Sequence, residues 1–284
     1  MMKKLFSILL IALLAISALP AQKALVISNG GVLEKSALRT IEGTVEAQSL
    51  SRAHEDAALI DSTLVELGWE VQRYSNLDAK TFKKSIGEFA ASIEDEEPVL
   101  IFFSGTAVQV DGKNYLVPQG TFRTQRRFVA SAPELSWILS QVSKASVKMV
   151  FLDASRAPTN LSFKPTKSGL TGLQKIAGNT LLMYSSPLDT IQPDQEGEHN
   201  HLPQALAKVI QTPDLPLQTL GDKIITQMGI LHGGKTPPIP YRISTIKEGW
   251  KLNPPKEEGE IKRIILRPPP LYRGNIDGGV APSF

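Results

Sequence analysis

The stretch VLIFFSGTAVQVDGKNYLVP, residues 99–118, indicates the fold more clearly than any other part of the 284-residue chain. Its first residues, VLIFF, are all apolar, which is typical of a strand buried on both faces of a parallel sheet. The glycine turn SGTA follows at once, and Asp111-Gly112 lies between two alternating segments, which predicts a hairpin. Ligands bind at the carboxyl ends of the strands in such sheets, so the SGTA turn is a candidate site.

Short apolar runs alternate with amphipathic stretches along the rest of the chain. Strands are predicted at residues 23–29, 69–74, 99–104, 147–153, 179–186 and 239–245. Helices are predicted at residues 54–68, 78–93, 133–142, 202–210 and 217–231. Strands that alternate with helices predict an α/β fold, here a three-layer α/β/α sandwich with a mostly parallel, six-stranded sheet.

Local signals predict where these helices begin and end. Gly68 is expected to cap the first helix, and Asp78 is expected to begin the second. Ser131 is expected to cap the helix that is entered at Pro133. A surface loop after the hairpin is expected to carry three basic residues, Arg123, Arg126 and Arg127.

The two ends of the chain differ from the part between them. The N-terminal segment has two lysines, an apolar run and then small residues, the pattern of a secretory signal peptide cleaved after Ala21; an uncleaved anchor is the alternative. Proline and glycine dominate from residue 253 on, where only residues 261–266 could form a strand. We therefore expect a signal peptide (1–21), one domain (22–252) and a Pro/Gly-rich tail (253–284), in a protein exported to the periplasm or the extracellular space.

Charge and residue content exclude several classes of function. Without Lys3 and Lys4 of the signal segment, the formal net charge falls from +3 to +1, which gives no basis for binding nucleic acid or an anionic membrane. The chain has no cysteine, so a cysteine nucleophile and a Cys-ligated metal are excluded. His199 and His201 lie near carboxylates in one loop, but their loose spacing favours a solvated loop over a metal site. We expect no metal and no cofactor.

Two strand ends, taken together, resemble those of the caspase-like cysteine peptidases, in particular the bacterial metacaspase and paracaspase branch. In that family the third strand ends in Ser-Gly-His-Gly, followed by an Asp-Gly hairpin and Leu-Ile-Pro; here the sequence reads SGTAVQVDGKNYLVP. The fourth strand of the family ends in Leu-Asp-Ala-Cys-Arg; here residues 152–156 read LDASR. The resemblance runs in family order from about Lys23 to Ser244 and implies the caspase-like fold.

The resemblance implies that both catalytic residues of the family are replaced. Thr106 stands where the family has its general base, a histidine, and Ser155 stands where it has its nucleophilic cysteine. A serine hydroxyl attacks only when a base removes its proton, and a threonine cannot be that base. We therefore expect a pseudopeptidase whose cleft still binds a peptide or protein ligand without cleaving it.

The resemblance also implies that parts of a substrate site remain. Asp153 matches an acidic residue that helps this branch accept Arg or Lys at the cleavage position, although capping of its own loop explains an aspartate there equally well. Backbone N–H groups near Gly105 and Ala107, and at Ser155, match the oxyanion hole. A second acid is expected after the fifth strand, where Asp194 is nearest but one residue out of register.

Two other functions stay open at this stage. An active endopeptidase would use Ser155 with a base recruited from another loop, and the candidates for that base are His199 and His201. A non-catalytic interaction scaffold would act through the tail, where residues 267–272 could form a polyproline ligand. The sequence identifies neither the partner nor the oligomeric state.

Overall fold

The computed structural model describes residues 22–30, 45–95, 97–157, 161–167, 169–233 and 239–253. The predicted signal segment, most of the predicted tail and the possible strand at residues 261–266 lie outside the described residues. The domain boundaries therefore stay a prediction.

A six-stranded sheet forms the centre of the protein, as predicted. Its strands, in spatial order, are β2 (Glu70–Ser75), β1 (Lys23–Ser28), β3 (Val99–Ser104), β6 (Val147–Asp153), β7 (Asn179–Tyr184) and β9 (Arg242–Ser244). The first five are parallel to one another, and β9 pairs antiparallel with β7. The mostly parallel sheet confirms the predicted fold class.

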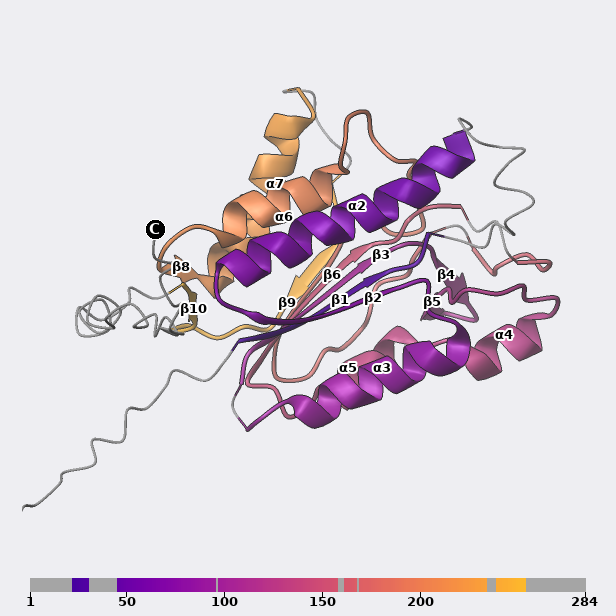
Figure 1. Ribbon diagram of the computed structural model, residues 1–284, viewed down its shortest axis with the longest axis horizontal. Helices are drawn as coiled ribbons and strands as arrows, with labels where there is room; N and C mark the ends of the chain where they lie inside the picture. Colours follow the sequence, from indigo (N-terminus) through magenta and orange to yellow (C-terminus); the bar gives the residue numbers. More distant parts are fainter. Residues whose placement is uncertain are drawn as a thin grey trace, which may run out of the picture.

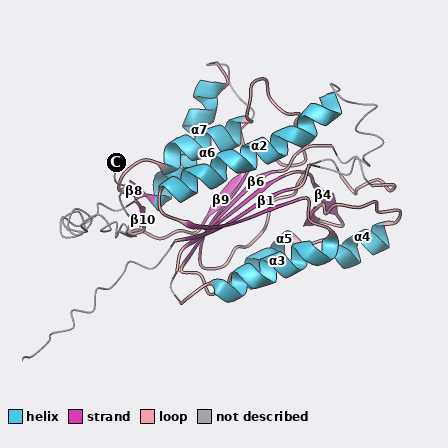
Figure 2. Ribbon diagram, viewed as in Figure 1, coloured by secondary structure: helices cyan, strands magenta, loops and turns pink. Residues whose placement is uncertain are grey.

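Helices cover both faces of the sheet and complete three layers (Figures 1 and 2). On one face lie α2 (Val45–Glu66), α6 (His201–Ile210) and α7 (Leu217–Leu231). On the other face lie α3 (Ala79–Ser92), α4 (Gln125–Ser131) and α5 (Leu135–Gln141). Each strand of the centre is thus buried on both sides, which explains why its sequence is an unbroken apolar run.

Alternate strand residues pack against opposite helix layers, because successive side chains of a strand point to opposite faces. The core on the α2, α6 and α7 side includes Ala24, Val26, Leu100, Phe102, Met149 and Phe151. The core on the α3 and α5 side includes Leu25, Ile27, Ile101, Phe103, Val150 and Leu152. All twelve side chains are at most 3% exposed, so two full apolar layers hold the sheet rigid beneath its carboxyl edge.

The helix ends agree with the sequence signals in part. Asp78 caps α3 by accepting a hydrogen bond from the N–H of Thr81 (2.8 Å), and Gly68 follows α2 with a φ of +87°. The prediction for Ser131 is wrong, because Ser131 is the last residue of α4. The predicted surface loop is also wrong in part, since Arg126 and Arg127 lie in α4, whose first turn is capped by Thr124.

The predicted hairpin is present at the carboxyl edge of the sheet. Strands β4 (Ala107–Val110) and β5 (Lys113–Leu116) pair antiparallel. The two residues between them have positive φ angles, 51° for Asp111 and 75° for Gly112, as a two-residue hairpin turn requires. Two very short strands, β8 (Leu215–Pro216) and β10 (Lys251–Leu252), also pair antiparallel and were not predicted.

Asn29, directly after β1, links three segments at this edge. Its Nδ2 donates to the carbonyl oxygens of Leu77 and Val117 (3.2 Å each), and its Oδ1 accepts from the N–H of Leu77 (2.9 Å). The Asn29 side chain is buried, so water does not replace these bonds. Asn29 therefore connects the end of β1 to the loop after β2 and to the exit of the hairpin.

We expect Asn29→Ala to lower the free energy of unfolding by roughly 2–4 kcal/mol, because it leaves buried backbone groups of Leu77 and Val117 without partners. Urea unfolding monitored by circular dichroism measures the loss. Gln72→Ala is the control: it removes one long hydrogen bond (3.4 Å) to Ser92 from a partly exposed position, and should change stability by less than about 0.5 kcal/mol. Equal effects of the two substitutions would contradict the linking role of Asn29.

Candidate functional site

The ends of β3 and β6 bring Thr106 and Ser155 next to each other. The two residues form an antiparallel bridge, although they are far apart in sequence. On either side of the bridge, the N–H of Gly105 donates to the carbonyl of Asp153 (3.1 Å) and the N–H of Ala107 donates to the carbonyl of Ala154 (2.9 Å). The two loops that the sequence singled out are therefore joined through their backbones.

Gly105 is required for this close approach. A Cβ atom at this position would lie 2.7 Å from the carbonyl oxygen of Asn29 and 2.8 Å from the ring of Phe103. Neither group has room to move, since Asn29 and Phe103 are both buried. The glycine thus lets the turn pass directly over the end of β1.

The Ser155 hydroxyl has a serine, not a base, as its partner. Its Oγ is hydrogen-bonded to the Oγ of Ser186, which follows β7, and Ser186 Oγ in turn lies 3.3 Å from the carbonyl oxygen of Pro187. Ser155 is only 3% exposed. The bonds give Ser155 no group that could take its proton near neutral pH.

The four histidines of the chain each have another partner. The Nδ1 of His54 lies 2.8 Å from Ser28 Oγ, and the Nδ1 of His199 lies 3.2 Å from Asp56 Oδ1. The rings of His201 and His232 pack edge to face, with centroids 5.6 Å apart. His199 and His201, the two candidates for a recruited base, are thus engaged elsewhere.

Two of the expected oxyanion donors are already used, because the N–H groups of Gly105 and Ala107 both donate to carbonyls of the β6 loop. The N–H of Ala107, in the turn that the resemblance matches to the oxyanion hole, donates to Ala154. A donor that stabilises a developing oxyanion must point at the place where that charge forms. The N–H of Ala107 instead stabilises the contact between the β3 and β6 loops.

A buried arginine occupies the space between the acidic side chains of the site. The Nη2 of Arg156 lies 3.1 Å from Asp153 Oδ2, 2.8 Å from Asp194 Oδ1 and 3.5 Å from Asp56 Oδ2. Its Nε donates to Asp194 Oδ1 (2.8 Å), and its Nη1 donates to the backbone carbonyls of Asp153 (2.7 Å) and Gly105 (3.1 Å). We call Asp56, Asp153 and Asp194 the carboxylate cluster.

The loop before α6 closes the carboxylate cluster from one side. Asn200 is buried; its Nδ2 donates to Asp153 Oδ2 (2.9 Å) and Asp194 Oδ1 (2.7 Å), and its N–H donates to Asp56 Oδ1 (3.1 Å). The sequence predicted that this loop is solvated, and this is wrong for Asp194 and Asn200. The Asp194 side chain turns inward to pair with Arg156, and the Asn200 side chain turns inward to donate to Asp153 and Asp194.

Burial and mutual repulsion perturb the protonation of the cluster. Burial, and after it the Asp153 carboxylate, raise the pKa of Asp56 to about 8 against the opposing effect of Arg156. For Arg156, burial lowers the pKa, but the Asp153, Asp194 and Asp56 carboxylates outweigh burial and leave the pKa above its ordinary value. The guanidinium therefore stays charged, and Asp56 holds a proton at neutral pH.

The structure brings together all the site residues named from the sequence and adds others. Thr106, Ser155, Asp153, Gly105 and Ala107 lie at one edge of the sheet, at the ends of β3 and β6. Sequence reasoning missed the parts played by Asp56, Arg156 and Asn200. For Asp56 a signal existed, since a charged residue stands on the otherwise apolar helix face of Ala53, Ala57 and Ile60.

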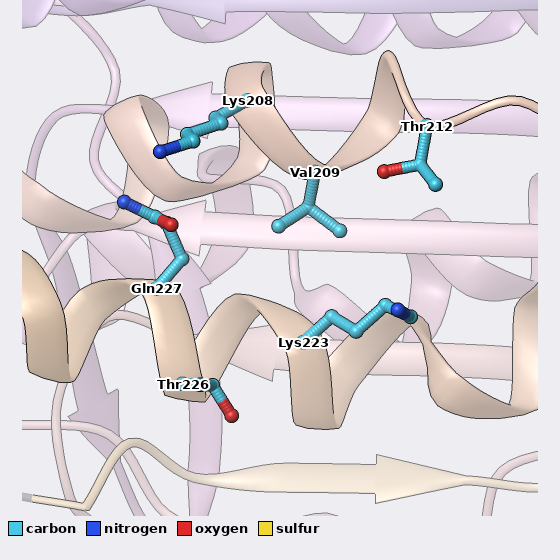
Figure 3. A pocket seen from close by; sticks show the side chains of 6 residues that line it. All are labelled: Lys208, Val209, Thr212, Lys223, Thr226 and Gln227. Atoms are coloured by element: carbon cyan, nitrogen blue, oxygen red, sulfur yellow. The ribbon is translucent and has the colours of Figure 1, made fainter.

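Three further features of the described residues concern metal ions, membranes and pockets. Among these residues no group of three or more His, Asp or Glu side chains is arranged to hold a metal ion, and no helix is long and apolar enough to cross a membrane. A shallow hollow between α6 and α7 is lined by Lys208, Val209, Thr212, Lys223, Thr226 and Gln227 (Figure 3). None of these six residues belongs to the strand ends.

Replacing Asp56 with Asn should change how stability depends on pH. The folded protein keeps a proton on Asp56 up to about pH 8, whereas the unfolded chain releases it near pH 4. The free energy of unfolding should therefore fall between about pH 5 and pH 8, by at most about 1.4 kcal/mol per pH unit, and Asp56→Asn should lose this fall.

Urea unfolding at several pH values measures this effect as the difference between wild type and variant. The difference cancels groups that titrate in this window without contacting Asp56, such as His54 and His201, whose pKa values are lowered by burial. Asp61→Asn, which removes a surface carboxylate paired with Arg73, should follow the wild type. Parallel curves for wild type and Asp56→Asn would contradict a proton on Asp56.

Comparison with known proteins agrees with the fold. A family model described as the caspase domain matches residues 21–246, which is most of the chain. No curated protein matches the chain. The matched region contains all six strands of the central sheet and both loops of the site. The chain belongs to the caspase domain family.

Proposed function

We propose that this protein is an exported caspase-like domain that binds a peptide or protein ligand without cleaving it. The observation that carries the proposal is the pair Thr106 and Ser155, which lie side by side where the family resemblance places base and nucleophile, and to which the geometry assigns no imidazole. Substrate positioning without a base leaves the hydroxyl as a poor nucleophile.

The chemistry of the two side chains supports the loss of hydrolysis. A cysteine exists partly as a thiolate near neutral pH, but a serine hydroxyl needs a base within hydrogen-bond reach. The hydrogen-bond partner of the Ser155 hydroxyl is Ser186, whose hydroxyl is no stronger a base than that of Ser155. Ser155 is also buried, so an incoming carbonyl carbon does not meet its Oγ without movement of the loop.

We expect purified mature protein to release no fluorophore from a panel of peptides that end in Arg or Lys. The measurement is a fluorogenic assay that compares the wild type with Ser155→Ala and with a buffer blank. Identical traces for all three are expected, because Ser155 lacks a base. Turnover in the wild type that Ser155→Ala abolishes would contradict the proposal.

A serine peptidase with a recruited base would need His199 or His201 at Ser155. His199 is instead bonded to Asp56, and the His201 ring packs on His232. If the assay above detects turnover, His199→Ala and His201→Ala identify the base, because only the residue that activates Ser155 lowers the rate as strongly as Ser155→Ala.

Export rests on the N-terminal segment of the sequence. Two lysines, an apolar run and small residues before Gln22 are the pattern of a cleaved signal peptide. Expressed in a bacterium with its own N-terminus, the protein should be recovered from the periplasm or medium, and mass spectrometry should show a chain that begins at Gln22. Insertion of Lys residues into the apolar run is the control, which should hold the full-length chain in the cytoplasm. An uncleaved, membrane-bound product would contradict export.

A further inference from the structure

Every nitrogen of the Arg156 guanidinium is engaged inside the protein. Nε and Nη2 contact carboxylates, and Nη1 contacts two backbone carbonyls and Ser104 Oγ (3.3 Å). A guanidinium has five N–H donors in one plane, and an ammonium group has only three donors around one atom. The acceptors around Arg156 come from several directions, and this arrangement fits the planar fork rather than an ammonium.

We propose that Arg156 is the built-in ligand of the carboxylate cluster and closes this part of the cleft to guanidinium groups of other molecules. The proposal rests on the proposed function and deepens it, because it states which ligands cannot bind in this part of the site. It revises the expectation that Asp153 binds a basic side chain of a ligand. The Asp153 carboxylate does bind a guanidinium, but that guanidinium belongs to the residue three positions along the chain.

The site has no capacity for a second cation while Arg156 is in place. Arg156 is 9% exposed, and Asp56 is fully buried. A second guanidinium in the same buried space would meet the positive charge of the first at short range, where screening by water is weak. It would also have to displace Asn200, which donates to all three residues of the carboxylate cluster.

The position of Arg156 in the chain strengthens the closure. Arg156 follows Ser155 directly, so the occupant is tethered to the loop that it blocks. A tethered group competes at an effective concentration in the millimolar range or above. A free guanidinium of similar intrinsic affinity must exceed that concentration to displace it, so basic side chains bind here only if Arg156 leaves the carboxylate cluster.

Truncation of Arg156 tests the proposal. Arg156→Ala removes the guanidinium and leaves the three carboxyls, which should bind N-acetylarginine amide roughly ten- to a hundredfold more tightly than the wild type does. Isothermal titration calorimetry measures both affinities. N-acetylnorleucine amide, which has no charge, is the ligand control and should gain nothing from the substitution. Guanidinium chloride at low millimolar concentration should also raise the melting temperature of Arg156→Ala more than sodium chloride does.

A matched control variant and a second substitution of Arg156 keep the test decisive. Arg73→Ala removes a partly exposed arginine that pairs with Asp61 at 3.3 Å, and guanidinium should stabilise it no more than salt does. If Arg156→Ala does not fold, Arg156→Gln, whose amide can still donate to the carbonyls of Gly105 and Asp153, takes its place.

Two outcomes would overturn the proposal. The first is binding of N-acetylarginine amide to the wild type as tightly as to the Arg156 variants, which would mean that Arg156 does not close the cluster. The second is a folded Arg156 variant with no gain in affinity. Both affinity measurements are independent of peptide turnover. The closure by Arg156 can therefore be disproved while the proposed lack of hydrolysis stands, and hydrolysis can be found while the closure stands.

Discussion

The ion-paired guanidinium of Arg156 is the interaction on which the carboxyl edge of the sheet depends. It joins Asp56 of α2, the turn after β3, the end of β6 and the loop before α6. Removing one partner of a buried ion pair typically costs about 3–5 kcal/mol, because the remaining charge stays in a poorly solvated place. Four segments from distant parts of the sequence are therefore coupled through this one side chain.

The two apolar cores hold the strands in place, and polar contacts at the carboxyl edge hold the loops of the site in place. The two cores fix the strands, so that Ser28, Ser104 and Asp153 end at one level of the sheet. Above that level a smaller apolar cluster packs the β4–β5 hairpin against α4, and hydrogen bonds of Asn29, Asn200 and Arg156 place the loops of the site. Such networks fix geometry more sharply than apolar contacts do, because donors and acceptors must be aligned.

The sequence predicted the sheet well because each strand carries its own local signal. Unbroken apolar runs and the Asp111-Gly112 turn depend on near neighbours only, and all six strands and the hairpin were found. Helix α4 was missed because it is short and buries only Phe128 completely, so its sequence shows no apolar stripe.

The polar partners of the site could not be predicted in the same way. Arg156 meets Asp56 and Asp194 across long stretches of chain, and no periodicity records a contact between residues so far apart. The resemblance to a family placed Thr106, Ser155 and Asp153 at the site, because motif positions carry over residue by residue. It did not reveal that the guanidinium paired with the carboxylate cluster belongs to Arg156, directly after the nucleophile position. The sequence alone does not show which way an arginine side chain points.

The hydrogen bond from the N–H of Ala107 to the carbonyl of Ala154 bears on catalysis through the main chain, not through the side chains. Competence for acyl transfer in this fold depends on which backbone amides are left unpaired as much as on which side chains are present. Exchanging the side chains at positions 106 and 155 would leave the amide of residue 107 committed to a neighbouring carbonyl. The N–H of Ala107 therefore becomes available to another acceptor only if the loops after β3 and β6 move apart, whatever side chains stand at positions 106 and 155.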